Sequence, residues 1–196
     1  MTWRLRRAVL GDALMLSRVA SATFRDTYAA VLDEADIEAH CTRNNSVAAF
    51  ERWLDDPATI VTLAEHQPAR ETIGYTVLTA PDFPIEIGPA DIELRRIYLA
   101  KQAQGSGLGA ALMTRALEDA AAHGRNRVLL GVWDQNTRAR AFYERQGFEV
   151  IGTRQFMVGT TLHDDPVYAR SVSKTRTKLK NATTPAKAGA QLERLK

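Results

Sequence analysis

The chain has 196 residues and a mass of 21.7 kDa, and 45% of its residues are hydrophobic and 25% charged. These values are typical of a globular domain with a full core, and they exclude wholesale disorder and a collagen-like or coiled-coil architecture. The single cysteine, Cys41, cannot form an internal disulfide, and the four histidines lack the spacing of a metal site.

The positive charge is concentrated at the C-terminus. Residues 173–196 carry seven basic residues and one acidic residue, a net charge of +6, whereas residues 1–172 carry 19 basic and 22 acidic residues, a net charge of −3. Because residues 173–196 contain no aromatic residue and no sustained apolar period, we expect a disordered tail without a specific nucleic-acid ligand. A basic arm that contacts nucleic acid through counterion release is the alternative. Residues 1–172 are expected to form the one folded domain.

The N-terminal segment shows no targeting pattern. Apolar residues follow Arg6 and Arg7, but Asp12 interrupts them after a few positions. A secretory signal needs about 7–15 consecutive apolar residues and a membrane helix about 20. We therefore expect a cytoplasmic protein that has no membrane partner.

The first half of the chain predicts mostly helices followed by a hairpin. Asp12 stands where a carboxylate is a favourable N-cap, and Pro68 and Arg70 indicate a turn between two strands rich in β-branched residues. In chain order, we expect an edge strand at 3–9, helices at 13–28, 34–40 and 47–54, strands at 59–64 and 72–79, and a loop at 81–89.

The second half predicts alternating strands and helices. Gly124 and Gly147 are placed to end the two helices, and the apolar run 128–133 is typical of a central strand covered on both faces. The expected elements are a strand at 91–99, a glycine loop at 104–109, a helix to about 123, a strand at 128–133, a helix at 136–146, and strands at 148–151, 154–158 and 166–170. The sum is an α/β domain with a mixed sheet and helices on both faces.

The glycine loop between a strand and a helix has the form of an anion site, because unpaired N–H groups at a helix start favour a bound phosphate. A nucleotide-binding P-loop would place Lys and then Ser or Thr after the last glycine, but Ala110 and Ala111 follow Gly109. A dinucleotide loop would follow the first strand of its domain, whereas this one follows several strands. A tight turn that binds nothing is the remaining alternative.

Two motifs in this half resemble those of one enzyme family. Gln104-x-x-Gly107-x-Gly109, preceded by residues 94–99, resembles the acetyl-CoA pyrophosphate motif of the GNAT N-acetyltransferases, and residues 133–148 resemble that family's second motif. The resemblance covers residues 3–172. It implies a mixed, mostly antiparallel sheet of six to seven strands with helices on both faces and a splayed central strand pair. It also implies acetyl-CoA as cosubstrate and no metal.

Three shorter segments resemble PaiA-type spermidine/spermine N-acetyltransferases: 23–28, 130–133, and Gly152 with 156–159. This similarity implies a small polyamine-like acceptor with a primary amine. Because the reaction needs no acyl-enzyme and Cys41 lies far from both motifs, we expect direct acetyl transfer within a ternary complex. A protein N-terminal or lysine acetyltransferase is the alternative enzyme, and a non-catalytic acyl-CoA-binding regulator is the alternative of another class. Many members of the family dimerise, so a homodimer is compatible with the sequence.

The resemblance also assigns the residues that bind the cosubstrate, partly through backbone groups and partly through side chains. Asn136 is expected to cap its helix as well as to contact the pantetheine. Phe142 also suits the core, and the charge of Arg145 also suits a solvated helix face. The expected cofactor-binding residues are Ile97, Tyr98, Leu99, Gln104, Gly105, Ser106, Gly107, Leu108, Gly109, Ala110, Asn136, Phe142, Tyr143 and Arg145.

Two residues are expected to carry the chemistry. Tyr143 matches the family's tyrosine acid, which protonates the departing thiolate. A primary amine is neutral only about one part in a thousand at pH 7, so its proton must be accepted. Glu93 is our candidate base, acting through water, and a carboxylate paired with Arg95 or Arg96 is the equal alternative. Substrate-binding residues are expected after the first helix, namely Phe24, Asp26, Tyr28 and Glu34.

Overall fold

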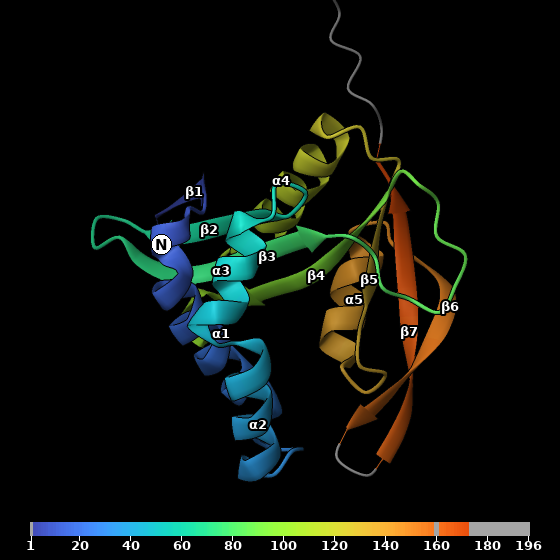
Figure 1. The fold of residues 1–196 in the computed structure, drawn as a ribbon, viewed down its shortest axis with the longest axis horizontal. Coiled ribbons are helices and arrows are strands. Elements are labelled where there is room, and N and C mark those ends of the chain that lie inside the picture. The colour runs from blue at the N-terminus through green and yellow to red at the C-terminus, as the bar shows by residue number, and fades with distance from the viewer. Residues whose placement is uncertain (1, 159–160, 173–196) are drawn as a thin grey trace, which may run out of the picture.

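The computed structural model describes residues 2–158 and 161–172, so the expected tail at 173–196 and Gly159 lie outside the described residues. Seven strands form one sheet in the order β1-β2-β3-β4-β5-β7-β6 (Figure 1). The strands are β1 (Trp3–Arg7), β2 (Ile60–His66), β3 (Glu71–Thr79), β4 (Asp91–Leu99), β5 (Arg127–Gly131), β6 (Glu149–Val158) and β7 (Thr161–Ser171). The helices are α1 (Ala13–Tyr28), α2 (Glu34–Asn44), α3 (Val47–Asp55), α4 (Leu108–Ala122) and α5 (Thr137–Arg145), with short 3-10 turns at Leu10–Asp12 and Lys101–Ala103.

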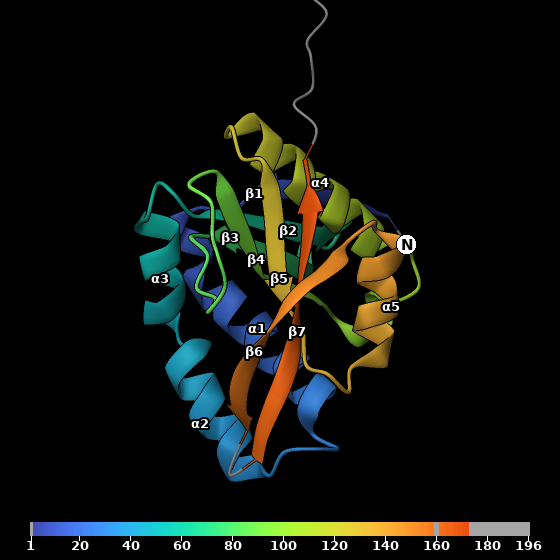
Figure 2. The same ribbon diagram turned by 90° about the vertical axis from the view of Figure 1, so that its right-hand side faces the viewer.

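The sheet is mixed and mostly antiparallel, as expected. Only the central neighbours β4 and β5 run parallel, and the other five neighbouring pairs are antiparallel. Helices α1 and α3 pack on one face of β2 and β3, and α4 packs on the other face (Figures 1 and 2). The fold expected from the resemblance is therefore confirmed.

The strand β5 is central and buried, as its apolar run predicted. Val128 and Leu130 pack into the core that includes α4, whereas Leu129 faces the other side. That other side is covered by the loop after β3, through Phe83 with Ile85 beside it, and not by a helix. Covering both faces explains why this strand carries no alternating polar positions.

Most of the predicted elements form, and several extend beyond the predicted ends. Helix α2 continues to Asn44, past the predicted end at residue 40. The two strands expected at 148–151 and 154–158 are one strand, β6, because Ile151 forms a bulge and the strand continues through Gly152. Gly124 and Gly147 have positive φ angles of 70° and 77° after α4 and α5, as expected for residues that end helices.

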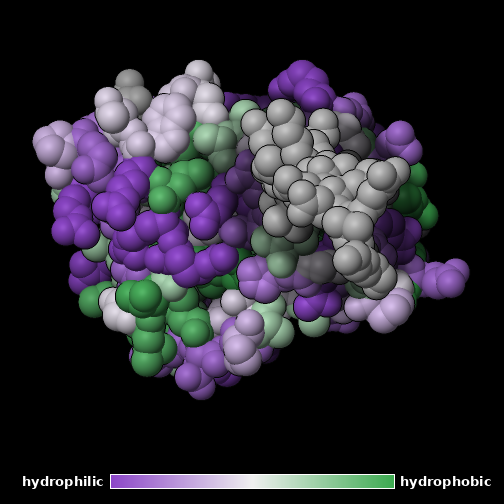
Figure 3. Space-filling model, turned by 90° about the horizontal axis from the view of Figure 1, so that it is seen from above, coloured by the Kyte–Doolittle hydropathy of each residue, from purple (hydrophilic) through white to green (hydrophobic). Residues whose placement is uncertain are grey.

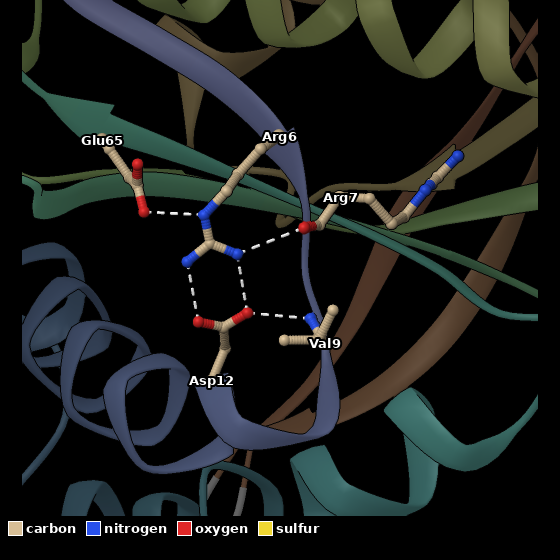
Figure 4. A network of polar contacts seen from close by, with 5 residues as sticks. All are labelled: Arg6, Arg7, Val9, Asp12 and Glu65. Atoms are coloured by element: carbon tan, nitrogen blue, oxygen red, sulfur yellow. Dashed lines mark hydrogen bonds and ion pairs between the residues drawn. The ribbon is translucent and has the colours of Figure 1, made fainter.

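The N-cap expected at Asp12 has a different role. Asp12 is in the N-cap position of α1, but its carboxylate makes no bond to the helix start. It accepts the Val9 backbone N–H at 2.8 Å and binds Arg6 through two nitrogens, each at 2.7 Å (Figure 4). Arg6 also donates from Nε to Glu65 on β2 at 2.7 Å. One guanidinium thus joins the edge strand β1, the start of α1 and the neighbouring strand.

Every helix within 2–158 and 161–172 falls short of the length and hydrophobicity that crossing a bilayer requires. On the face shown in Figure 3, hydrophilic residues cover most of the described surface and hydrophobic residues form small separate areas.

Candidate active site

The two central strands separate at one end. β4 and β5 pair over only a few residues, and Glu93 opposite Leu129 is the last pair. β4 then continues to Leu99 with β3 alone as its described neighbour, so the backbone of 94–99 is open on the side of β5. A bulge leaves Arg95 without a register partner on β3. The predicted splay is confirmed, and it exposes strand backbone to a ligand that can pair with it.

A cleft of about 2020 Å³ opens where the strands separate. Sites for single small ligands are usually about 300–1,000 Å³, so this cleft has room for two substrates. Its walls come from α1, α2, β4, the glycine loop, α5 and β7. The sequence-predicted residues that line it are Phe24, Asp26, Tyr28, Ile97, Tyr98, Leu99, Gln104, Gly105, Gly107, Gly109, Ala110, Asn136, Phe142, Tyr143 and Arg145.

The structure places four predicted site residues away from the cleft wall: Glu34, Glu93, Ser106 and Leu108. Leu108 is fully buried in the core beneath the loop. The Ser106 hydroxyl donates to the Ala103 carbonyl at 2.7 Å and accepts the Leu108 N–H at 3.4 Å. Both residues therefore support the loop from below.

The glycine loop leads directly into the start of α4. Gly105 and Gly107 have φ angles of 77° and 87°, a left-handed conformation that favours glycine. Gly107 is the N-cap residue and offers no side chain to the helix start, and Gly109 and Ala110 in the first turn of α4 line the cleft. Successive turns of this kind form a concave arrangement of N–H groups that suits an anion.

Basic side chains flank the loop. Lys101, Arg138 and Arg145 are exposed and line the same cleft. Arg138, on the first turn of α5, donates to the Gln104 side chain at 2.7 Å and so fixes α5 against the loop. Gln104 and Arg145 were predicted as binding residues, whereas Lys101 and Arg138 were not, and the fold makes them neighbours of the loop. The helix itself begins as predicted, because the Asn136 side chain accepts the Ala139 N–H at 3.1 Å.

Tyr143 lies on the inner side of α5. Its half-buried ring contacts the rings of Phe142, Phe148 and Tyr168, with centroid distances of 5.5, 6.1 and 6.3 Å. Burial, and next the Tyr98 hydroxyl, raise the pKa of the Tyr143 phenol well above its ordinary value. The phenol therefore stays protonated at neutral pH, and it can donate a proton to a basic atom in the cleft.

Two more tyrosines line the same part of the cleft, Tyr28 at the end of α1 and Tyr98 on β4. Burial raises the pKa of the Tyr28 phenol, and the hydroxyls of Tyr98 and Tyr143 and the Asp165 carboxylate raise it further. The three hydroxyls and the carboxylate are thus close enough to interact. All three tyrosines were predicted as site residues from the sequence, whereas Asp165 was not.

Glu93 lies behind the cleft. It is 3% exposed, and its carboxylate accepts Arg95 at 2.6 Å and the Asp82 N–H at 3.2 Å. Burial raises the pKa of Glu93, while the Arg95 guanidinium opposes that change. The structure contains the ion pair with Arg95, which joins the buried Glu93 carboxylate to an exposed arginine that lines the cleft.

Aromatic rings line the cleft beside the tyrosines. Phe24 stacks on His40 with a centroid distance of 3.8 Å and contacts Tyr28 at 4.5 Å. Burial, and next Arg96, lower the pKa of His40 to about 4, so this ring is neutral at physiological pH. This end of the cleft is therefore aromatic and carries no histidine charge.

Carboxylates from the α1–α2 region border this aromatic end. Asp26, Asp33 and Asp36 line the cleft. Glu34 does not line it, because its exposed carboxylate binds Arg25, which also binds Glu38. Of the two acids expected at a substrate entrance, Asp26 and Glu34, only Asp26 lines the cleft, together with two aspartates that were not predicted.

The described part of the chain has no cluster of three or more His, Cys, Asp or Glu residues placed to hold a metal ion. The described cleft presents backbone N–H groups, phenols, cations beside the loop and the carboxylates of the α1–α2 region. Further arginines also line it, namely Arg43, Arg52, Arg95, Arg96 and Arg154.

Comparison with known proteins connects this cleft to one family. The model of the acetyltransferase (GNAT) family matches residues 23–148. An uncharacterized N-acetyltransferase of Mycobacterium tuberculosis is 35% identical over 161 residues, which cover 82% of this chain and 98% of that protein.

Solved structures share the fold. PaiA N-acetyltransferase from Thermoplasma acidophilum, in complex with coenzyme A, has a TM-score of 0.72 at 22% identity and covers 87% of this chain and 99% of that chain. The YncA structure from Salmonella typhimurium with its cofactor acetyl-CoA has a TM-score of 0.64 at 16% identity. The match covers 88% of this chain and 95% of that chain. At these identities the similarity concerns the fold.

Proposed function

The chain belongs to the GNAT family of acetyltransferases and is an acetyl-CoA-dependent N-acetyltransferase, and we propose that its acceptor is a small polyamine-like primary amine. One observation carries the proposal: a single cleft joins the anion-binding loop, the open edge of β4, Tyr143 and a group of carboxylates. The cosubstrate and a cationic acceptor fit at opposite ends of this cleft. Direct transfer between two substrates bound together follows from that arrangement.

The residues present suit acetyl-CoA. The N–H groups from Gly105 to Ala110 are proposed to bind the diphosphate, with Lys101, Arg138 and Arg145 as neighbouring cations. The open backbone of 97–99 is proposed to pair with the pantetheine amides, and Asn136 and Phe142 to border that arm. When bound, acetyl-CoA supplies the activated acetyl group as a thioester.

The glycine at 107 offers a test of the loop. Substituting Gly107→Ala forces an L side chain into a left-handed conformation, which costs about 1–2 kcal/mol. The free loop can relieve this strain by leaving the left-handed conformation, so binding of acetyl-CoA has to restore it. Because a tenfold change in affinity corresponds to about 1.4 kcal/mol, we expect the KM for acetyl-CoA to rise by up to about thirtyfold. Steady-state kinetics measure this change. Gly11→Ala is the matched control, since Gly11 has open space and an unstrained backbone; an equal KM in both variants would contradict the assignment.

Tyr143 is proposed to protonate the departing sulfur. Tyr143 lines the cleft together with the glycine loop, Tyr28 and Tyr98, and its raised pKa keeps the proton available. The acceptor nitrogen must be neutral when it attacks, so it releases its own proton first. Because Glu93 lies outside the cleft and is paired with Arg95, we assign that proton to solvent water in the open cleft.

The pH profile follows from these two protons. A primary amine has a pKa of about 10.4, so the neutral fraction rises about tenfold for each pH unit between 7 and 9. The acid form of Tyr143 is lost only above the ordinary tyrosine range of about 10, because its pKa is raised. We therefore expect kcat/KM for the amine to rise from pH 7 to 9 without a falling limb below pH 10. A decline beginning near pH 8 would exclude Tyr143 as the acid.

The acceptor end supports a cationic substrate. Asp26, Asp33 and Asp36 line the cleft, and the net charge of residues 1–172 is −3, which favours the approach of a polycation. The test is release of free thiol from acetyl-CoA with a panel of polyamines, peptides with free N-termini or lysines, and aminoglycosides. We expect the highest kcat/KM with a polyamine. Turnover confined to the peptides would replace the proposed acceptor by a protein substrate.

A further inference from the structure

One face of α2 forms part of the cleft wall at the acceptor end. Positions three and four apart share a helix face, and the α2 residues that line the cleft follow this spacing: Asp36, His40, Arg43 and Asn44. We propose that Arg96 on β4 is a positioning residue that holds this face of α2 in place and thereby sets the affinity for the acceptor amine. This inference rests on the proposed acceptor end of the cleft and not on which amine binds there.

The helix α2 packs on α1 through a small cluster. Its buried residues Ile37 and Cys41 contact Phe24, with Tyr28 and Leu32 beside them. Figures 1 and 2 show α2 beyond the outer end of α1, below β2 and β3. A helix with few buried apolar contacts is displaced at a low free-energy cost, so its position depends on whatever else holds it.

Arg96 holds α2 at its C-terminal end. Its Nη2 donates to the Asn44 carbonyl oxygen at 3.1 Å, and its Nη1 donates to Oδ1 of Asn45, the C-cap residue of α2. Asn45 is buried, and its Nδ2 donates to Sγ of Cys41 at 3.7 Å. One guanidinium therefore binds a backbone and a side-chain oxygen at the end of the helix, and hydrogen bonds from a charged donor are the stronger kind.

The guanidinium is itself held in place by the sheet and by α3. Its central carbon lies 4.9 Å from the centroid of the Trp53 ring and 5.8 Å from that of the Phe50 ring. Its Nη1 also donates to the Tyr75 hydroxyl on β3 at 3.4 Å. A planar arginine can stack on rings and donate to several acceptors at once, whereas a lysine ammonium is a single point charge. Arg96 therefore joins α2 and α3 to β3 and β4, in the part of β4 that has separated from β5.

The first test is Arg96→Lys, which keeps the positive charge and removes the planar fork. Binding of the acceptor then has to restore the wall, so we expect the KM for spermidine to rise at least about tenfold. The KM for acetyl-CoA should change less than about threefold, because the glycine loop and the backbone edge of β4 are unaltered. A role in folding alone would lower the apparent kcat and leave both KM values unchanged, since unfolded molecules bind neither substrate.

The second test separates positioning from direct contact, because Arg96 also lines the cleft. Asn45→Ala removes one acceptor of Arg96, and Asn45 does not line the cleft. We expect this variant to raise the KM for spermidine at least about fivefold, and the double variant to raise it no further than Arg96→Lys does, since both act through the same contact. An unchanged KM in Asn45→Ala, or effects that add fully, would overturn the positioning role.

Arg127→Lys is the matched control. Arg127 on β5 binds the buried Asp91 carboxylate through Nε at 3.0 Å and Nη2 at 2.6 Å, and it does not line the cleft. The substitution removes the same fork at a distance from α2, so we expect lower stability with both KM values unchanged. A rise in the KM for spermidine equal to that of Arg96→Lys would show that the effect is not specific to α2, and it would overturn the proposal.

A measurement without turnover separates this inference from the proposed acceptor. Hydrogen exchange of the free protein, followed by mass spectrometry, reports on α2 directly. In Arg96→Lys we expect the amides of residues 38–45 to exchange at least about tenfold faster, whereas those of α4 keep their wild-type rates. Faster exchange in a protein that does not acetylate spermidine would support the positioning role and refute only the polyamine acceptor. Wild-type exchange rates in 38–45 would overturn the positioning role whatever the acceptor.

Discussion

Tyr143→Phe is expected to lower kcat about 100-fold to 10,000-fold, the usual contribution of a positioned general acid or base. The substitution removes only the hydroxyl, so the ring keeps its contacts with Phe142, Phe148 and Tyr168. The dissociation constant of acetyl-CoA should change less than threefold, because the loop and the strand edge that bind it are unaltered. Steady-state kinetics and calorimetry measure the two quantities.

Tyr168→Phe provides the matched control in the neighbouring ring. The Tyr168 hydroxyl donates to Glu144 at 3.0 Å, and this residue does not line the cleft. The same hydroxyl accepts Arg140 Nε at 3.4 Å, so its loss removes two hydrogen bonds and should cost about 1–3 kcal/mol of stability while leaving kcat within a fewfold of wild type. If Tyr143→Phe were as active as this control, another group would have to protonate the sulfur.

Arg6→Met is expected to destabilise the fold by about 3–5 kcal/mol, because it breaks a buried ion pair from one side. Glu65, with a side chain only 4% exposed, would lose its bond to Arg6, and Asp12 would lose both of its bonds to the guanidinium (Figure 4). The Oε2 atom of Glu65 already has no hydrogen-bond partner among the described residues. Urea denaturation followed by circular dichroism measures the free energy of unfolding.

Two controls test whether the loss of stability in Arg6→Met comes from the unpaired buried charge. Arg4→Met changes an exposed arginine of the same strand and should alter stability by less than about 0.5 kcal/mol. Adding Glu65→Gln to Arg6→Met removes the buried charge and should restore part of the loss. No restoration would mean that the arginine stabilises through packing alone.

The same network predicts a pH dependence. Arg6 holds the pKa of Asp12 below its ordinary value, so the ionised carboxylate stabilises the folded state above the ordinary aspartate range of about 4. This contribution is lost as the pH falls through the lowered folded-state pKa. In Arg6→Met, stability should be less sensitive to acid below pH 4.

Much of the fold was predictable because its signals are local. The boundaries of α1 and β4 were predicted to the residue, since the apolar face of the helix and a run of strand-forming residues determine them. The two segments of β6 appeared separate, because a bulge at Ile151 and the glycine beside it look like a strand break until β7 supplies the partner. Likewise, Asp12 appeared to be a helix cap because its partner Arg6 comes from a neighbouring strand.

The family assignment, the loop and Tyr143 came from the sequence alone, because backbone conformation at glycines and a short helical motif are encoded in neighbouring residues. The carboxylate assignments needed the tertiary structure. Glu93 and Asp165 are both buried acids on strands, and only the tertiary structure shows that Glu93 is paired with Arg95 and does not line the cleft, whereas Asp165 does. Local sequence sets the conformation of a segment, whereas the side of the sheet on which a charge meets its partner depends on strands distant in the chain.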